Sequence, residues 1–197
     1  MNRAVRERAL GALVLLGLTA GLVPQTVRAR DGGPYPLACR DVHADFARHE
    51  GCARRAGDWI RIDPARLARM PFKDGVTEIV VDGIGWLWTR RDGLALPVFP
   101  LDNGPDPFAQ GLVRARHAGK VAFHDRRLCR VLTTDFDWSF PFNARGEALV
   151  CRGCRSDGRQ PSAMVGGRWG LIDRRGRLTR RLEKGQDAAR RYFDWPR

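Results

Sequence analysis

The sequence predicts a mainly β protein, built from stacked and curved antiparallel β-hairpin repeats with a small N-terminal helical cap. Three observations support this prediction: a patterned string near the C-terminus, weaker copies of it upstream, and short alternating apolar stretches between turn residues. A repeat of this kind has one apolar face that it cannot bury alone, so neighbouring copies must stack. We therefore expect one continuous stack of sheets with no pocket built for catalysis.

The most patterned string is "GGRWGLIDRRGRL", residues 166–178. The alternation of Trp169 and Leu171 predicts a β-strand. Asp173 and Gly176 then occupy the first and fourth positions of a turn, which is typical of a type I turn completed by a left-handed glycine. The chain then returns as a partner strand, and Gly166-Gly167 are expected to form a second tight turn back to a strand at residues 162–165, so the segment is predicted to form a three-stranded meander.

A second copy lies upstream in residues 119–127, "GKVAFHDRR". It aligns Phe123 with Leu171 and Asp125 with Asp173, and it places a pair of arginines after the aspartate. The period is about 35 residues, with an insertion that lengthens the last copy, and a fixed period of this length is the signature of a repeat architecture.

A third copy, residues 83–91, is aligned through its glycine and its arginine pair, which leaves Trp86 shifted by one position. The second copy has Val121-Ala122 in place of Trp-Gly, and Leu128 in place of the turn glycine. We expect these degenerate copies to keep their strands but to have altered turns. The residues predicted to form the repeat core are Trp88, Phe123, Trp169 and Gly170.

These strings resemble the repeat of the WG-repeat (KWG) family, and the chain looks like an exported bacterial member. The family repeat reads approximately Phe-x-x-Gly-Leu-x-x-Val, then Gly-Lys-Trp-Gly-Tyr-Ile-Asp-x-x-Gly. Residues 166–178 match the second half and residues 108–125 match the first. The resemblance extends from about Gly75 to the C-terminus, which implies a WG-like repeat domain over residues 75–197. It implies no catalytic residue and no cofactor, because most members have no established activity.

The N-terminus has the layout of a secretory signal peptide, predicted for residues 1–29 with cleavage after Ala29. A basic start is followed by an apolar run over residues 9–23, and Pro24 ends it. An uncleaved anchor is the alternative, but the run of about 15 residues is shorter than the ~20 that span a bilayer. We expect a periplasmic or secreted protein with no stable membrane anchor after cleavage.

Residues 30–74 lie outside the resemblance and are predicted to form an N-terminal cap segment over the first repeat. One short helix is expected between Cys39 and Cys52. A second helix is expected after Asp63, a capping residue followed by proline at the first helical position. A strand is expected at residues 59–62.

Disulfides are the default interpretation of the five cysteines in an exported protein. We predict the pairs Cys39–Cys52 and Cys151–Cys154, and we expect Cys129 to be a buried thiol.

Two other interpretations of these cysteines are considered. The first is a zinc site with an unusual ligand spacing, formed by Cys39, His43, His49 and Cys52. The second is a redox couple of Cys151 and Cys154. A catalytic Cys-x-x-Cys normally lies at a helix N-terminus, whereas this one follows a predicted strand.

The chain is strongly basic, with a net charge of +13 from 35 lysines and arginines against 22 acidic residues. Cleavage of the signal peptide removes four arginines and one glutamate, which lowers the net charge to +10. Export argues against nucleic acid as the partner. The expected partner is a periplasmic protein or an anionic envelope component, and an arginine-rich composition without any partner is the alternative.

We therefore expect a non-enzymatic binding or scaffold module, because the sequence contains no nucleophile elbow, His-Glu-x-x-His motif or phosphate-binding loop. Alternatives are a thiol-redox protein that uses the Cys-x-x-Cys pair, and a secreted inhibitor or immunity protein. The residues proposed for an interaction surface are Trp138, Trp195, Arg174 and Arg175. Packing between repeats is the other interpretation of the two tryptophans.

Overall fold

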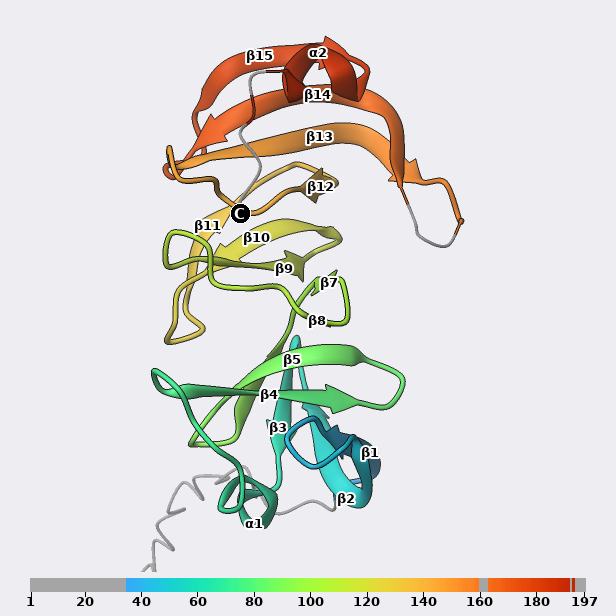
Figure 1. Cartoon of the computed structure of the whole chain (residues 1–197), viewed down its shortest axis with the longest axis vertical. Helices are drawn as coiled ribbons and strands as arrows, with labels where there is room; N and C mark the ends of the chain where they lie inside the picture. The colour runs from blue at the N-terminus through green and yellow to red at the C-terminus, as the bar shows by residue number, and fades with distance from the viewer. Residues whose placement is uncertain (1–34, 160–162, 192, 194–197) are drawn as a thin grey trace, which may run out of the picture. The chain divides into compact units, whose positions relative to one another are not determined.

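The computed structural model describes residues 35–159, 163–191 and 193 (Figure 1), so the predicted signal peptide and Trp195 lie outside the described residues. The described part of the chain is mainly β. Its antiparallel sheets comprise a closed six-stranded barrel and sheets of three, four and two strands. None of the helices in this part is long and apolar enough to cross a membrane.

The barrel contains the first six strands, in the order β1-β2-β3-β6-β5-β4. These strands are β1 (Leu37–Asp41), β2 (Ala47–Ala56), β3 (Trp59–Ile62), β4 (Val76–Val81), β5 (Gly85–Arg90) and β6 (Leu94–Pro97). Alternate side chains point inward, so Ile60, Ile79 and Leu87 are almost completely buried in one core cluster. The predicted division between residues 30–74 and 75–197 falls inside this barrel, because β1–β3 precede it and β4–β6 follow it.

One of the two predicted helices of the N-terminal segment is present. Helix α1 (Pro64–Leu67) begins after Asp63, whose side chain accepts a hydrogen bond from the backbone N–H of Ala65 at 3.1 Å. Leu67 on this helix is buried against the barrel core. The local signal of a capping aspartate followed by proline was therefore sufficient to locate the helix.

The helix predicted between Cys39 and Cys52 is wrong. The chain continues as β1, turns at Asp45 and Phe46 with φ values of 48° and 57°, and returns as β2. A short polar helix would have been marginal on its own. In the structure the backbone of this segment instead makes hydrogen bonds between strands of the barrel, where β1 pairs with both β2 and β4.

Each of the three related strings forms the middle strand of an antiparallel meander. The first meander is β4-β5-β6 within the barrel, and the second is the sheet of β9 (Val113–His117), β10 (Lys120–His124) and β11 (Arg130–Thr133). The third is β13 (Glu147–Ser156), β14 (Met164–Asp173) and β15 (Leu178–Lys184), to which β12 (Trp138–Ser139) is added. The short hairpin β7 (Pro100–Leu101) and β8 (Gly104–Pro105) follows the barrel, and helix α2 (Gln186–Arg190) follows β15.

The turns of the second and third meanders have the same hydrogen bonds, so the expectation of an altered turn in the second copy is wrong. Oδ1 of Asp125 accepts from the backbone N–H groups two and four residues downstream at 2.9 and 2.8 Å. Oδ1 of Asp173 does the same, at 2.9 Å for both. Leu128 adopts the left-handed φ of 62° where Gly176 has 79°. The buried side chain of Leu128 opposes the cost of this conformation.

The expected shift of Trp86 is also wrong. Trp86 lies three residues before Thr89, which forms the register pair of β5 with β6 nearest their turn. Trp169 lies three residues before Ile172, which forms the pair of β14 with β15 nearest their turn, so the two tryptophans are equivalent. The arginine pair is shifted instead, because Arg90 occupies the first turn position that Asp173 occupies in the third meander: its carbonyl oxygen accepts from the N–H of Gly93, as that of Asp173 accepts from Gly176.

The predicted repeat-core residues differ in their burial. Trp169 and Phe123 are almost completely buried, whereas Trp88 is half-buried in a cluster that includes Val76 and residues of the second meander. Gly170 is buried where β15 crosses closely, and a Cβ atom on it would lie 2.6 Å from the carbonyl oxygen of Arg180. The glycine of the Trp-Gly pair is therefore required by the close approach of a neighbouring strand.

The cysteines pair as predicted in two cases and differ in the third. Cys39 pairs with Cys52 across β1 and β2, and Cys151 pairs with Cys154 within β13. Both sulfur atoms of the zinc-site interpretation are therefore used in a disulfide. The prediction that Cys129 is buried is wrong, because Leu128 occupies the interior position of the turn and the next side chain is exposed. The two disulfides indicate a location outside the cytosol.

Candidate functional site

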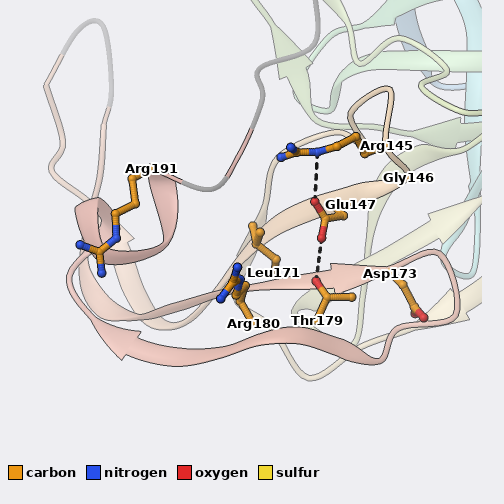
Figure 2. A pocket seen from close by; sticks show the side chains of 8 residues that line it. All are labelled: Arg145, Gly146, Glu147, Leu171, Asp173, Thr179, Arg180 and Arg191. Atoms are coloured by element: carbon orange, nitrogen blue, oxygen red, sulfur yellow. Dashed lines mark hydrogen bonds and ion pairs between the residues drawn. The ribbon is translucent and has the colours of Figure 1, made fainter.

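An open groove of about 630 Å³ lies along the third meander and is the candidate functional site (Figure 2). Its lining comes from the turn before β13, from β13, β14 and β15, and from the residue that follows α2. Helix α2 packs against β14 and β15. The residues that line the groove are Arg145, Gly146, Glu147, Leu171, Asp173, Thr179, Arg180 and Arg191.

The turn that presents Arg145 repeats the turn chemistry of the meanders. Oδ1 of Asn143 accepts from the backbone N–H groups of Arg145 and Glu147, both at 3.0 Å. Gly146 has a φ of 74°, and a Cβ atom on it would lie 3.6 Å from Cδ of Arg174. The turn before β13 is therefore in contact with the turn between β14 and β15. Two aspartate- or asparagine-capped turns form one end of the groove.

A chain of polar contacts crosses the groove floor, as the dashed lines in Figure 2 show. Nε of Arg145 lies 3.4 Å from a carboxylate oxygen of Glu147, and the hydroxyl of Thr179 donates to the other carboxylate oxygen at 3.0 Å. These contacts hold the carboxylate of Glu147, whose side chain is about one quarter exposed, in one position on the groove floor.

Asp173, the second carboxylate of the groove, is held by Arg177. Its carboxylate accepts from the backbone N–H of Arg177 and from Nε of the same residue, each at 2.9 Å. The backbone hydrogen bond, followed by the side-chain bond, holds the pKa of Asp173 below its usual value. Both carboxylates of the groove are therefore engaged by donors of the protein itself.

Three arginines of the groove supply donors from three different segments. Arg145 lies on the turn before β13, Arg180 lies on β15, and Arg191 follows α2, where it is 4.0 Å from Glu183. A guanidinium group has five N–H donors in a planar fork that matches carboxylate and phosphate oxygens. Thr179 is the one side-chain hydroxyl in the lining, and it donates to Glu147. The groove can thus hold an anion, but its lining contains no nucleophile paired with a base.

The residues predicted for an interaction surface are only partly close to this groove. Arg174 and Arg175 are exposed in the turn between β14 and β15, where the stem of Arg174 contacts Gly146. Trp138 is half-buried between two core clusters, and its ring centroid lies 5.0 Å from that of Phe99. This environment agrees with the packing interpretation of Trp138.

Sequence reasoning did not select Arg145, Arg180 or Arg191. A signal for Arg145 was present, because "NARGE" has the capping residue, arginine and glycine of the "DRRGR" turn. The other two arginines had no such signal, since their proximity depends on the pairing of β14 with β15 and on the packing of α2.

A buried ion pair was also missed. Oδ2 of Asp106 accepts from the backbone N–H and from Nε of Arg114, both at 2.9 Å, and both side chains are at most 2% exposed. The guanidinium group also donates to the carbonyl oxygen of Ser139 and lies 5.3 Å from the ring centroid of Phe99. This pair joins the loop after β8 to the second meander and to β12, so it is part of the scaffold.

The Cys151–Cys154 pair lies in a strand. Cys151 faces Trp169, and Cys154 faces Gly166, on the neighbouring strand β14. A Cβ atom on Gly167 would lie 2.7 Å from Sγ of Cys151 and 2.6 Å from the backbone nitrogen of Cys154. The disulfide is therefore packed against a glycine of the β14 string and does not lie at a helix N-terminus.

Comparison with known proteins gives no assignment: no family model, no curated protein and no solved structure matches this chain.

Proposed function

We propose that this protein is an exported, non-enzymatic binding module of the WG-repeat type. In this proposal the groove of the third meander holds a partner that bears carboxylate or phosphate groups, either an anionic envelope polymer or an acidic periplasmic protein. The observation that supports it is the convergence of Arg145, Arg180 and Arg191 on one open groove.

The electrostatics of the groove favour an anionic partner. Glu147 is engaged by Arg145 and Thr179, and Asp173 by Arg177, so neither carboxylate needs a cation from a partner. Arg180 and Arg191 reach the groove from β15 and from the segment after α2. Charge complementarity of this kind raises association rates and selects partners by sign. The net charge of +10 after removal of the predicted signal peptide acts in the same direction.

The openness of the groove favours an extended partner over a small enclosed substrate. Its lining comes from the turn before β13, from β13, β14 and β15, and from Arg191 after α2, and the groove that these residues form is open. An acidic peptide or a polysaccharide with charged substituents can lie along such a surface and present several anionic groups to the arginines.

A binding measurement with two matched variants tests this proposal. Arg180→Gln removes a guanidinium group from the groove, whereas Arg181→Gln removes one from the next residue of β15, which does not line the groove and is 89% exposed. The probe is a polyglutamate peptide, with a polyphosphate chain as a second probe, measured by calorimetry at fixed ionic strength. We expect Arg180→Gln to weaken binding about tenfold, the loss of one charged hydrogen-bonding group.

The control decides between site binding and general attraction. Equal weakening by Arg180→Gln and Arg181→Gln would mean that only net charge matters, and it would reject the groove as the site. No binding of either probe by the unmodified protein would reject the proposed class of partner.

A further inference from the structure

A second open pocket, of about 470 Å³, lies where the first and second meanders meet and is distinct from the groove. Arg90 at the end of β5 contributes to it, together with Asp74 and Gly75 from the turn before β4. The turn between β10 and β11 contributes the rest of the lining. The residues that line it are Asp74, Gly75, Arg90, Arg126, Arg127 and Cys129.

Two of the arginines are fixed by contacts between the meanders. Nη1 of Arg90 donates to the carbonyl oxygen of Arg127 at 3.1 Å, and its Nη2 pairs with Asp92 at 2.7 Å. Nη1 of Arg126 lies 3.3 Å from a carboxylate oxygen of Asp74, and its guanidinium carbon lies 4.8 Å from the ring centroid of Phe108. These two guanidinium groups are therefore held near the pocket before any ligand arrives, which lowers the entropic cost of binding.

The third arginine of the pocket, Arg127, does not stabilise the fold through its side chain. Arg127 is exposed, and its guanidinium group has no ion-pair partner among the described residues, although its carbonyl oxygen is bound by Arg90. The lining thus contains three guanidinium groups and one carboxylate, that of Asp74. The excess positive charge is concentrated in a concave site.

We infer that this pocket binds a phosphate group, as free phosphate or as a phosphate monoester. Three arginines line the pocket, one from the end of β5 and two from the turn between β10 and β11, which suits a tetrahedral dianion that accepts hydrogen bonds in several directions. A single carboxylate is planar and monovalent, so it would engage fewer of these donors. This inference does not depend on the proposed function of the groove.

Cys129 offers a direct readout, because it lines the pocket and the other four cysteines are paired in disulfides. The thiol is the reporter here and has no assigned role in binding. Iodoacetate carries a negative charge and iodoacetamide is neutral, so the ratio of their alkylation rates at Cys129 measures the local preference for an anion. The full chain without reductant is used, and mass spectrometry locates the modification.

We expect Arg127→Gln to lower the iodoacetate-to-iodoacetamide rate ratio about threefold, the effect of one nearby charge at intermediate dielectric. The matched control is Arg175→Gln, the equivalent turn position of the third meander, which lines neither pocket. This control should leave the ratio unchanged. Inorganic phosphate, added to the unmodified protein at constant ionic strength, should slow alkylation in a saturable way, and glycerol phosphate should do the same if monoesters are accepted.

Each outcome decides the inference. An unchanged ratio in a folded Arg127→Gln protein, or an equal fall in Arg175→Gln, would overturn it. If Arg127→Gln fails to fold, the phosphate arm with the unmodified protein remains decisive: saturable protection supports the site, and equal protection by chloride shows ionic screening only and overturns it. Protection by inorganic phosphate but not by glycerol phosphate would identify the free ion as the ligand. Binding of polyglutamate at the groove is measured separately, so its failure would not change this result.

Discussion

The barrel contains the first of the three related meanders, and the four-stranded sheet contains the last. The apolar side chains of these two meanders are buried in different ways. In the barrel, β3 pairs with β6 and β1 with β4, so the sheet closes and Leu87 faces an interior. The sheet of β12–β15 stays open, and buried residues of β14 contribute to two clusters, Trp169 to one and Ile172 to the other. Closure removes sheet edges, whereas the open sheet keeps β15 as an edge with an arginine groove beside it.

The largest expected effect comes from comparing the same substitution in the two regions. Leu87→Ala empties a fully buried position of the barrel and should lower the free energy of unfolding by about 3 kcal/mol. Leu178→Ala on the edge strand β15, where the side chain is 50% exposed, should lower it by less than about 1 kcal/mol. Urea denaturation measures both. A similar loss of unfolding free energy at the two positions would show that burial in the barrel does not determine the cost of the substitution.

A second experiment compares the third meander with the second. Gly170→Ala adds a Cβ atom within 2.6 Å of the carbonyl oxygen of Arg180, and we expect about 2 kcal/mol of destabilisation from the forced backbone shift. The equivalent residue in the second meander is Ala122, which is already buried with its methyl group. Ala122→Gly should therefore cost about 1–2 kcal/mol, through backbone entropy and loss of the buried methyl group. The result to rule out is a neutral Gly170→Ala, which would mean that β14 and β15 are not closely apposed at this point.

The smallest expected effect concerns the ion pair that joins these two meanders. Nζ of Lys120 on β10 lies 2.6 Å from Asp137, and this hydrogen bond, with one from the backbone N–H of Gly153, lowers the pKa of Asp137. Since the pKa is lower in the folded state, the stabilisation is present above the unfolded pKa of about 4 and is lost as the pH falls through the folded value. We expect about 0.5 kcal/mol, because the pair is partly exposed.

Unfolding measured between about pH 5 and pH 2, in the protein and in Asp137→Asn, checks this prediction. The variant should lose less stability over this range. An identical pH dependence in both proteins would show that Asp137 makes no contribution.

The sequence predicted the parts of this fold whose signals are local. The string around Trp169 and Asp173 contains the alternation of a strand and the chemistry of its turn, so the hairpin of β14 and β15 could be read from contiguous residues. Asp63 followed by Pro64 located α1 for the same reason. The tight turn predicted at Gly166-Gly167 is wrong, because both glycines lie inside β14, whose other partner is β13. The turn at Leu128 does not follow from a local signal: a left-handed position predicts glycine, whereas burial of the leucine side chain offsets the left-handed backbone here.

The closed barrel and the two arginine sites could not be read in this way. The register of β3 with β6 joins Ile60 to Ala95, and no local pattern encodes a pairing between positions so far apart. The groove requires Arg145, Arg180 and Arg191 to converge from separate segments.

The sequence by itself determined the hairpin of β14 and β15, the turn that begins at Asp173, and the two cysteine pairs, because each depends on residues close together in the chain. Only the tertiary structure decided that the first meander closes into a barrel with the N-terminal strands and that the last remains open with a basic groove. The physical reason is that strand closure and side-chain convergence depend on long-range pairing, whose free energy is shared among many residues and leaves no signature in any one of them.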